Sequence, residues 1–283
     1  MKAFLILEDG TVFTGTSIGS AREAVSEIVF NTSMTGYLEV LTDPSYAGQA
    51  VVMTYPLIGN YGICYDDMES ARPWPDGFIV RELSRLPSNF RCEDTIQNFL
   101  EKNDIPGISG IDTRALTKIL REKGTMNGMI TTREYEDLEE PISRIKAYSV
   151  KGVVKATSCK EKYVLEPEDS KLQEPVRRVA LLDLGAKKNI ARSLVERGCE
   201  VTVYPCDTPA EEILASCPDG IMLSNGPGDP KENTEIIREI RKLYESDTPI
   251  FAICLGHQLM ALATGADTVS YTHLRAHETD SYL

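Results

Sequence analysis

Residues 249–265 read PIFAICLGHQLMALATG, an apolar run that passes into a helical pattern without an intervening loop. The change falls at Cys254, and Gly256 follows two positions later. Such a strand-to-helix turn is a nucleophile elbow, which exposes a side chain and directs helix N-terminal amides toward it. Glycine suits this position because a β-carbon would crowd the turn. We predict that Cys254 is a reactive thiol; the competing interpretation is a small buried core residue, as free cysteines commonly are.

A second loop, SNGPGDP at residues 224–230, ends the apolar run that precedes this one. Two glycines and two prolines in seven residues fix the shape of the loop and can turn its amides outward. Such amides stabilise a developing oxyanion, a role worth about 3 to 4 kcal/mol per donor. The alternative is a tight turn without a function. The loop lacks the lysine and the serine or threonine of a phosphate-binding P-loop, so it does not predict a nucleotide site.

Strands and helices alternate around these two features. We predict strands at 179–184, 201–204, 220–223 and 249–253, and helices at 187–197, 209–216 and 232–244. Apolar runs separated by helices indicate a parallel sheet covered on both faces. Right-handed crossovers place the loops that follow the strands at one edge, where doubly wound folds bind ligands. The loop and Cys254 should therefore share an edge.

Residues 1–150 follow no single period and predict a separate domain of mixed α and β structure. The opening MKAFLILEDGTVFTGTSIG predicts a β-hairpin around Asp9-Gly10. Apolar and β-branched runs broken by turn residues continue from 27 to 56. Helices are predicted at 93–102 and 112–123, the second with Asp112 or Thr113 as N-cap and Gly124 as its C-terminal stop.

Residues 151–176 turn polar and lose periodicity after Ala156, which predicts an interdomain linker. The predicted fold class is α/β: an N-terminal mixed α and β domain at 1–150, followed by an incomplete doubly wound parallel-sheet domain at 177–267.

Composition narrows the possible partners. Asp and Glu number 43 against 30 Lys and Arg, a net charge of −13 that repels phosphate backbones and anionic membranes. We therefore expect no nucleic-acid or membrane partner, and no apolar stretch has the length of a signal-peptide core or a membrane span. The seven cysteines are scattered and form no C-x-x-C pair, which argues against a disulfide framework or a zinc site. Reduced thiols in the cytoplasm fit best.

Together, the elbow and SNGPGDP resemble the class I glutamine amidotransferase family. Three N-terminal runs are similar to the first domain of the carbamoyl phosphate synthetase small-subunit family, a domain that other amidotransferases lack. They are EIVFNTSMTGYLEVLTDPSYAGQ (27–49), TYPLIGNYG (54–62) and ISGIDTRALTKILREKGTMNG (108–128). The resemblance covers residues 1 to about 267, and it implies the class I amidotransferase fold for 177–267.

The resemblance implies roles for particular residues. Cys254 would attack the side-chain amide of glutamine, and the amides of Gly228 and Leu255 would stabilise the oxyanion. Serine hydroxyls and amide side chains suit the polar end of an amino acid. Without the family, Ser45 reads as a turn residue and Gln258 as a solvated helix position. The implied glutamine contacts are Ser45 from the first domain, Gly226, Gly228, Leu255 and Gln258.

Two departures from the family pattern stand out. Ala252 replaces the glycine that is more common two residues before the cysteine. After Asp267 the family supplies a catalytic histidine followed two residues later by glutamate, whereas TVSYTHLRAHETDSYL at 268–283 resembles nothing in the family. His277 and Glu278 are adjacent, so they are not assigned as that pair. We expect the catalytic base to be absent and glutamine hydrolysis by this chain to be weak or undetectable.

The resemblance also implies a reaction and a partner. Ammonia from glutamine would pass to a large synthetase subunit that makes carbamoyl phosphate for arginine and pyrimidine synthesis, a ligase reaction. ATP and magnesium would bind that large subunit, with no cofactor and no metal in this chain. The alternative is a non-catalytic binding subunit or a gene fragment that only docks the large subunit. An amidotransferase serving a different synthetase is disfavoured by the N-terminal domain.

Overall fold

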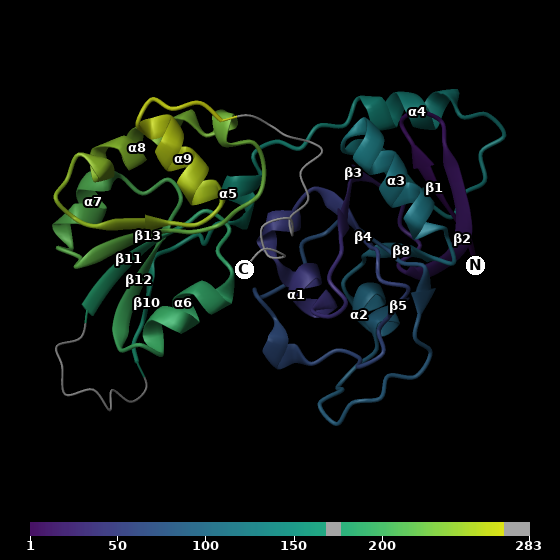
Figure 1. Ribbon diagram of the computed structural model, residues 1–283, viewed down its shortest axis with the longest axis horizontal. Helices are drawn as coiled ribbons and strands as arrows, with labels where there is room; N and C mark the ends of the chain where they lie inside the picture. The colour runs from purple at the N-terminus through teal and green to yellow at the C-terminus, as the bar shows by residue number, and fades with distance from the viewer. Residues whose placement is uncertain (168–176, 269–283) are drawn as a thin grey trace. The chain divides into compact units, whose positions relative to one another are not determined.

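The computed structural model describes residues 1–167 and 177–268, which divide into two compact units after Val150 (Figure 1). Within these residues, no helix combines the length and apolar character needed to cross a membrane. All seven cysteines are free thiols.

The first unit is built on a closed barrel with the strand order β1-β2-β8-β6-β4-β3-β9. The predicted hairpin is confirmed: β1 and β2 pair antiparallel, and Gly10 occupies the turn with a φ of 86°. A separate short pair joins β5 and β7. The strands are β1 (Lys2–Leu7), β2 (Val12–Gly19), β3 (Ala24–Asn31), β4 (Gln49–Met53), β5 (Leu57–Ile58), β6 (Gly77–Ile79), β7 (Glu82–Leu83), β8 (Pro106–Ser109) and β9 (Met126–Thr131).

Four neighbouring barrel strands, β3, β4, β6 and β8, run parallel to one another. Successive residues of a strand face opposite sides, and β4 follows this rule. Ala50 and Val52 pack in a cluster with residues of β1 and of the helix that follows β8, whereas Val51 and Met53 pack with the helices on the other side. The carboxyl ends of all four strands consequently lie at one edge of the barrel.

The helices of the first unit lie outside these strands (Figure 1). The prediction for 112–123 is confirmed: the carboxylate of Asp112 accepts the amide of Ala115, and Gly124 ends the helix with a φ of 89°. A short helix interrupts the run expected to be β-rich, because Tyr37, Leu38 and Leu41 all bury on one side of it. The helices are α1 (Tyr37–Thr42), α2 (Ile96–Lys102), α3 (Thr113–Lys123) and α4 (Glu139–Lys146), with single 3-10 turns at Pro44–Tyr46 and Tyr65–Asp67.

The second unit contains a five-stranded sheet with the order β10-β12-β11-β13-β14. The four predicted strands are present and parallel, as expected. Their bounds are β11 (Arg177–Asp183), β12 (Cys199–Pro205), β13 (Gly220–Leu223) and β14 (Ile250–Ala252), and the helices are α6 (Lys188–Val195), α7 (Ala210–Ala215), α8 (Thr234–Tyr244) and α9 (Leu255–Ala263), with a 3-10 turn at Pro230–Glu232.

The linker prediction is wrong for residues 151–167, while residues 168–176 lie outside the described chain. This stretch supplies α5 (Val153–Thr157) and β10 (Tyr163–Leu165), and β10 pairs antiparallel with β12. Val154 belongs to one hydrophobic core of the second unit, and Leu165 packs against the other. This stretch is therefore part of the folded second unit.

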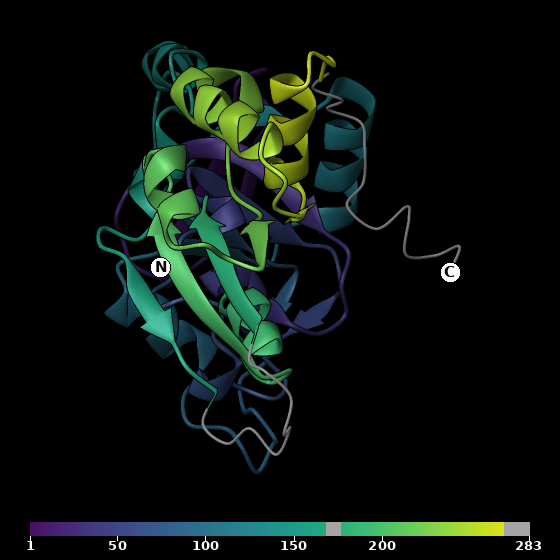
Figure 2. The same cartoon turned by 90° about the vertical axis from the view of Figure 1, so that its left-hand side faces the viewer.

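Helices cover both faces of this sheet, as predicted. Ala191 of α6 packs on one face with Leu181 of β11, whereas α7, α8 and α9 pack on the other with Leu182 and Leu223. Figure 2 shows α8 and α9 side by side, in yellow-green and yellow. The turn between β14 and α9 contains Cys254.

Candidate active site

Cys254 occupies a strained turn between β14 and α9. Its backbone has a φ of 48° and a ψ of −110°, a conformation uncommon for a residue with a side chain. The residue is exposed. This geometry agrees with the predicted elbow and contradicts the alternative of a buried core cysteine. Strain of this kind gathers at functional sites, where the surrounding structure maintains it.

Gly256 lets the elbow lie directly against β13. A methyl group at this position would lie 2.7 Å from both the β-carbon and the carbonyl oxygen of Leu223. The Gly256 amide also donates to the carbonyl oxygens of Ser224, at 3.1 Å, and Ile253, at 2.9 Å. The start of α9 is therefore fixed onto the end of the neighbouring strand, as the sheet-edge argument requires.

The loop that begins at Ser224 lies beside the elbow. The Ser224 hydroxyl is buried, accepts the Leu184 amide at 2.9 Å and donates to the Asn225 carbonyl at 2.7 Å. At Gly226 a methyl group would collide with the Leu184 carbonyl oxygen and approach a δ-carbon of Leu255 to 2.8 Å. Close backbone packing thus explains the glycine and brings this loop against the first residue of α9.

Gly228 and Leu255 carry the two amides expected to stabilise an oxyanion. Gly228 has a φ of 84°, and Leu255 is the first residue of α9. Within residues 1–167 and 177–268, neither amide donates a hydrogen bond. A methyl group on Gly228 would lie 2.7 Å from a γ-carbon of Val153, so α5 packs against this loop. Both amides are available to a ligand, and their role stays a prediction.

Asp183 is a structural residue of this edge that the sequence analysis did not single out. It ends β11, is buried, and accepts the amides of Gly185 at 2.9 Å, Ala186 at 2.7 Å and Cys159 at 2.8 Å. The available signal was an acidic residue at the end of an apolar strand, two residues before Gly185. Its carboxylate therefore fixes the loop after β11. In this loop the amide of Leu184 contacts the Ser224 hydroxyl, and the carbonyl oxygen of Leu184 lies against Gly226.

The remaining predicted contacts lie on different parts of the chain. Gln258 and His257 are exposed on the first turns of α9. Ser45 belongs to the first unit, where its amide donates to the Asp43 carboxylate at 2.9 Å. The glutamine contacts of Ser45 and Gln258 stay predictions. Ala252 pairs in register with Leu223, so alanine is accommodated in β14. His277 and Glu278 lie outside the described residues.

The other cysteines differ from Cys254 in their surroundings. Burial raises the pKa of Cys159 to about 12, and the neighbouring Asp183 carboxylate adds to the effect. Burial also raises the pKa of Cys206. Cys217 is the other exposed cysteine of the chain. No group of three or more histidine, cysteine or acidic side chains within residues 1–167 and 177–268 is arranged to hold a metal ion.

Comparisons with known proteins match both units. The family model described as carbamoyl-phosphate synthase small chain, CPSase domain, matches residues 5–130, and the model of glutamine amidotransferase class-I matches residues 180–282. The second match runs into the segment 268–283 that the sequence analysis sets apart from the family. A solved aminopeptidase from Aneurinibacillus sp. strain AM-1 aligns over 89% of this chain and 56% of its own, with 10% identity and a TM-score of 0.29. This score is too low to indicate a shared fold.

Full-length relatives give the same assignment. The carbamoyl phosphate synthase small chain of Clostridium perfringens is 52% identical over 268 residues, which cover 95% of this chain and 74% of the relative. That of Oceanobacillus iheyensis is 52% identical over 94% of this chain and 71% of its own. That of Vibrio cholerae is 48% identical over 95% and 74%. With its barrel unit and its amidotransferase unit both matched, the chain belongs to the family of carbamoyl phosphate synthase small chains.

Proposed function

We propose that this chain is the glutamine-hydrolysing component of a carbamoyl phosphate synthase. The thiolate of Cys254 attacks the side-chain amide carbon of glutamine and forms a tetrahedral oxyanion. The C–N bond then breaks, the nitrogen leaves as ammonia with an added proton, and a γ-glutamyl thioester remains on sulfur. Water hydrolyses that thioester to glutamate and regenerates the thiol.

The observation that carries this proposal is the exposed, strained Cys254 at the N-terminus of α9. The helix N-terminus directs free backbone amides and the positive end of the helix dipole toward this position, where they stabilise negative charge. The amides of Gly228 and Leu255, which donate no hydrogen bond among the described residues, supply donors for the oxyanion, and Gly226 lets their loop pack closely against Leu184 and Leu255. The carboxyl edge of the parallel strands is where doubly wound folds bind ligands.

Proton transfer needs a general base and acid, and His257 is the only histidine among the described residues. It lies on α9 beside the substrate-contact candidate Gln258, and we do not assign it the role of base. A positioned general base contributes about 100-fold to 10,000-fold to such reactions.

The partner we propose is a large synthetase subunit. It would receive ammonia and use ATP, magnesium and bicarbonate to make carbamoyl phosphate for arginine and pyrimidine synthesis. The two matched domain models and the names of the relatives support this assignment. Cytoplasmic localisation is part of the proposal, and the seven free thiols support it.

An electrophilic glutamine analogue tests the proposal without requiring full turnover. The analogue carries a reactive carbon in place of the side-chain amide, and peptide mass spectrometry identifies the modified cysteine. Cys254 should be labelled first, free glutamine should slow its labelling, and Cys254→Ala should remove it. Cys217→Ala is the matched control, because Cys217 is exposed and lies outside the elbow. Equal labelling of Cys217 and Cys254, or labelling that glutamine does not slow, would instead favour a non-catalytic subunit.

A further inference from the structure

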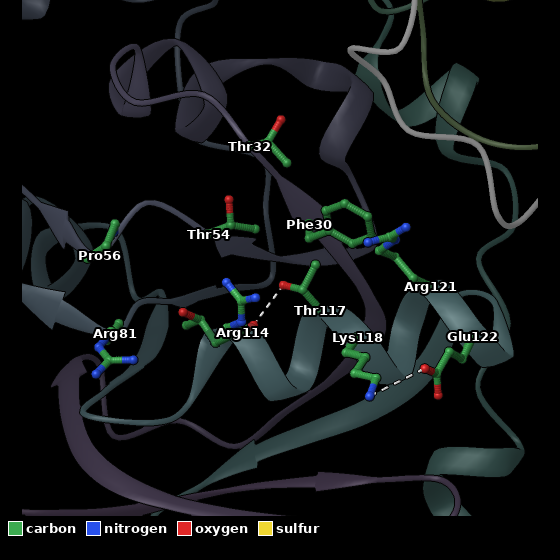
Figure 3. A pocket seen from close by; sticks show the side chains of 11 residues that line it. Phe30, Thr32, Thr54, Pro56, Arg81, Arg114, Thr117, Lys118, Arg121 and Glu122 are labelled. Atoms are coloured by element: carbon green, nitrogen blue, oxygen red, sulfur yellow. Dashed lines mark hydrogen bonds and ion pairs between the residues drawn. The ribbon is translucent and has the colours of Figure 1, made fainter.

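The first unit contains a cavity of about 690 Å³ at the carboxyl edge of its parallel strands (Figure 3). Thr32 directly follows β3, Thr54 follows β4, and Arg81 follows β6 by two residues. Helix α3, which comes shortly after β8, forms the opposite wall. The edge where parallel strands end and a following helix begins is a common ligand-binding position in α/β folds.

Four cationic side chains line this cavity: Arg81, and Arg114, Lys118 and Arg121 of α3. The one acidic residue of the lining, Glu122, forms an exposed ion pair with Lys118 at 3.8 Å. Within residues 1–167 and 177–268, none of the three arginines has an ion-pair partner. The chain as a whole carries a charge of −13, so its acidic residues are placed elsewhere while this wall stays cationic.

Neutral groups complete the lining. In Figure 3 the hydroxyl groups of Thr32 and Thr54 stand across the cavity from α3, and neither has a hydrogen-bond partner among the described residues. The Thr117 hydroxyl is already used, because it donates to the Thr113 carbonyl at 2.7 Å. The ring of Phe30 supplies an apolar surface beside Arg121.

We propose that this cavity binds a phosphate-bearing small molecule. The planar forks of arginine donate paired hydrogen bonds to phosphate oxygens, and a phosphate carries enough charge to engage several cations at once. The threonine hydroxyls add uncharged donors. The volume exceeds that of a bare phosphate and falls in the range of small-molecule sites, so the remainder of the ligand would contact Phe30.

Calorimetric titration of the full chain with pyrophosphate tests this site. We expect saturable binding of one pyrophosphate per chain, weakened about tenfold or more by Arg114→Gln and by Arg121→Gln, since each removes a charged hydrogen-bond donor. Arg85→Gln is the matched control: Arg85 is an exposed arginine of the same unit, has no ion pair among the described residues and does not line the cavity.

Three results would overturn the proposal: no saturable binding at about 10 mM pyrophosphate, an equal loss of affinity in Arg85→Gln, or citrate binding as tightly as pyrophosphate. The last would identify a general anion surface without preference for phosphate. The inference does not depend on glutamine hydrolysis. Labelling of Cys254, which lies in the second unit, should be unchanged in Arg114→Gln, and a urea unfolding curve of the variant verifies that its first unit is folded.

Discussion

The amide of Gly256 donates a hydrogen bond to the carbonyl oxygen of Ser224 across 3.1 Å. This contact joins two loops that are about thirty residues apart in sequence and brings the proposed nucleophile beside the proposed oxyanion donors. It requires the two backbones to approach so closely that no side chain fits between them. Any β-carbon at residue 256 would have to displace β13 or the elbow.

Replacing Gly256 by alanine should therefore destabilise the second unit and slow alkylation of Cys254. The added methyl would lie 2.7 Å from the Leu223 backbone and side chain, and overpacking of this kind costs about 1 to 3 kcal/mol. Urea unfolding and the alkylation rate of Cys254 measure the two effects. Gly220→Ala is the control, because its methyl would meet only the Pro249 carbonyl at an ordinary 3.6 Å. Equal stability of the two variants would contradict the packing argument.

The sequence predicts the second unit well because continuous apolar runs mark buried parallel strands, and residues 220–223 coincide with the predicted strand. It does not predict β10, since three residues carry too little periodicity and their burial depends on pairing with β12. Closure of the barrel likewise depends on pairings such as β3 with β9, between segments about a hundred residues apart. The sequence does not predict the cationic cavity for a similar reason: Arg81 and Arg121 line one cavity only once the barrel has folded.

Cysteine reactivity should follow exposure and pKa. With iodoacetamide at pH 7, Cys254 should react about tenfold faster than Cys217, since both are exposed but only Cys254 begins a helix. Cys159 should react slowest at this pH because its pKa of about 12 leaves almost no thiolate, and its rate should climb only in strongly alkaline solution. Timed quenching with peptide mass spectrometry gives each rate. Matching rates for Cys254 and Cys217 would exclude activation by the elbow.

Asp183→Asn should destabilise the second unit by about 1 to 3 kcal/mol. One carboxylate oxygen accepts the amides of Gly185 and Ala186, and the other accepts the amide of Cys159. In asparagine one of these acceptors becomes an NH2 group, so at least one buried amide loses its partner. Chemical denaturation measures the loss. Asp247→Asn, at an exposed residue with no hydrogen bond among the described parts of the chain, should leave stability unchanged.

Asp94→Asn should lower the stability of the first unit at neutral pH but not in acid. Burial raises the pKa of Asp94, but hydrogen bonds from Lys102, Asn98 and the Thr95 amide outweigh it and hold the pKa below its ordinary 3.8. Because the folded-state pKa is depressed, its contribution, about 1 kcal/mol, is present above pH 4 and is lost as the pH falls through the folded-state value. Denaturation at pH 7 and at about pH 3 measures the stability difference between the variant and the parent chain, and this difference should be smaller at the lower pH. Asp66→Asn supplies the control, because Asp66 is exposed and has no ion pair or hydrogen bond among the described residues. A stability difference between Asp94→Asn and the parent chain that stays constant with pH would refute the assignment.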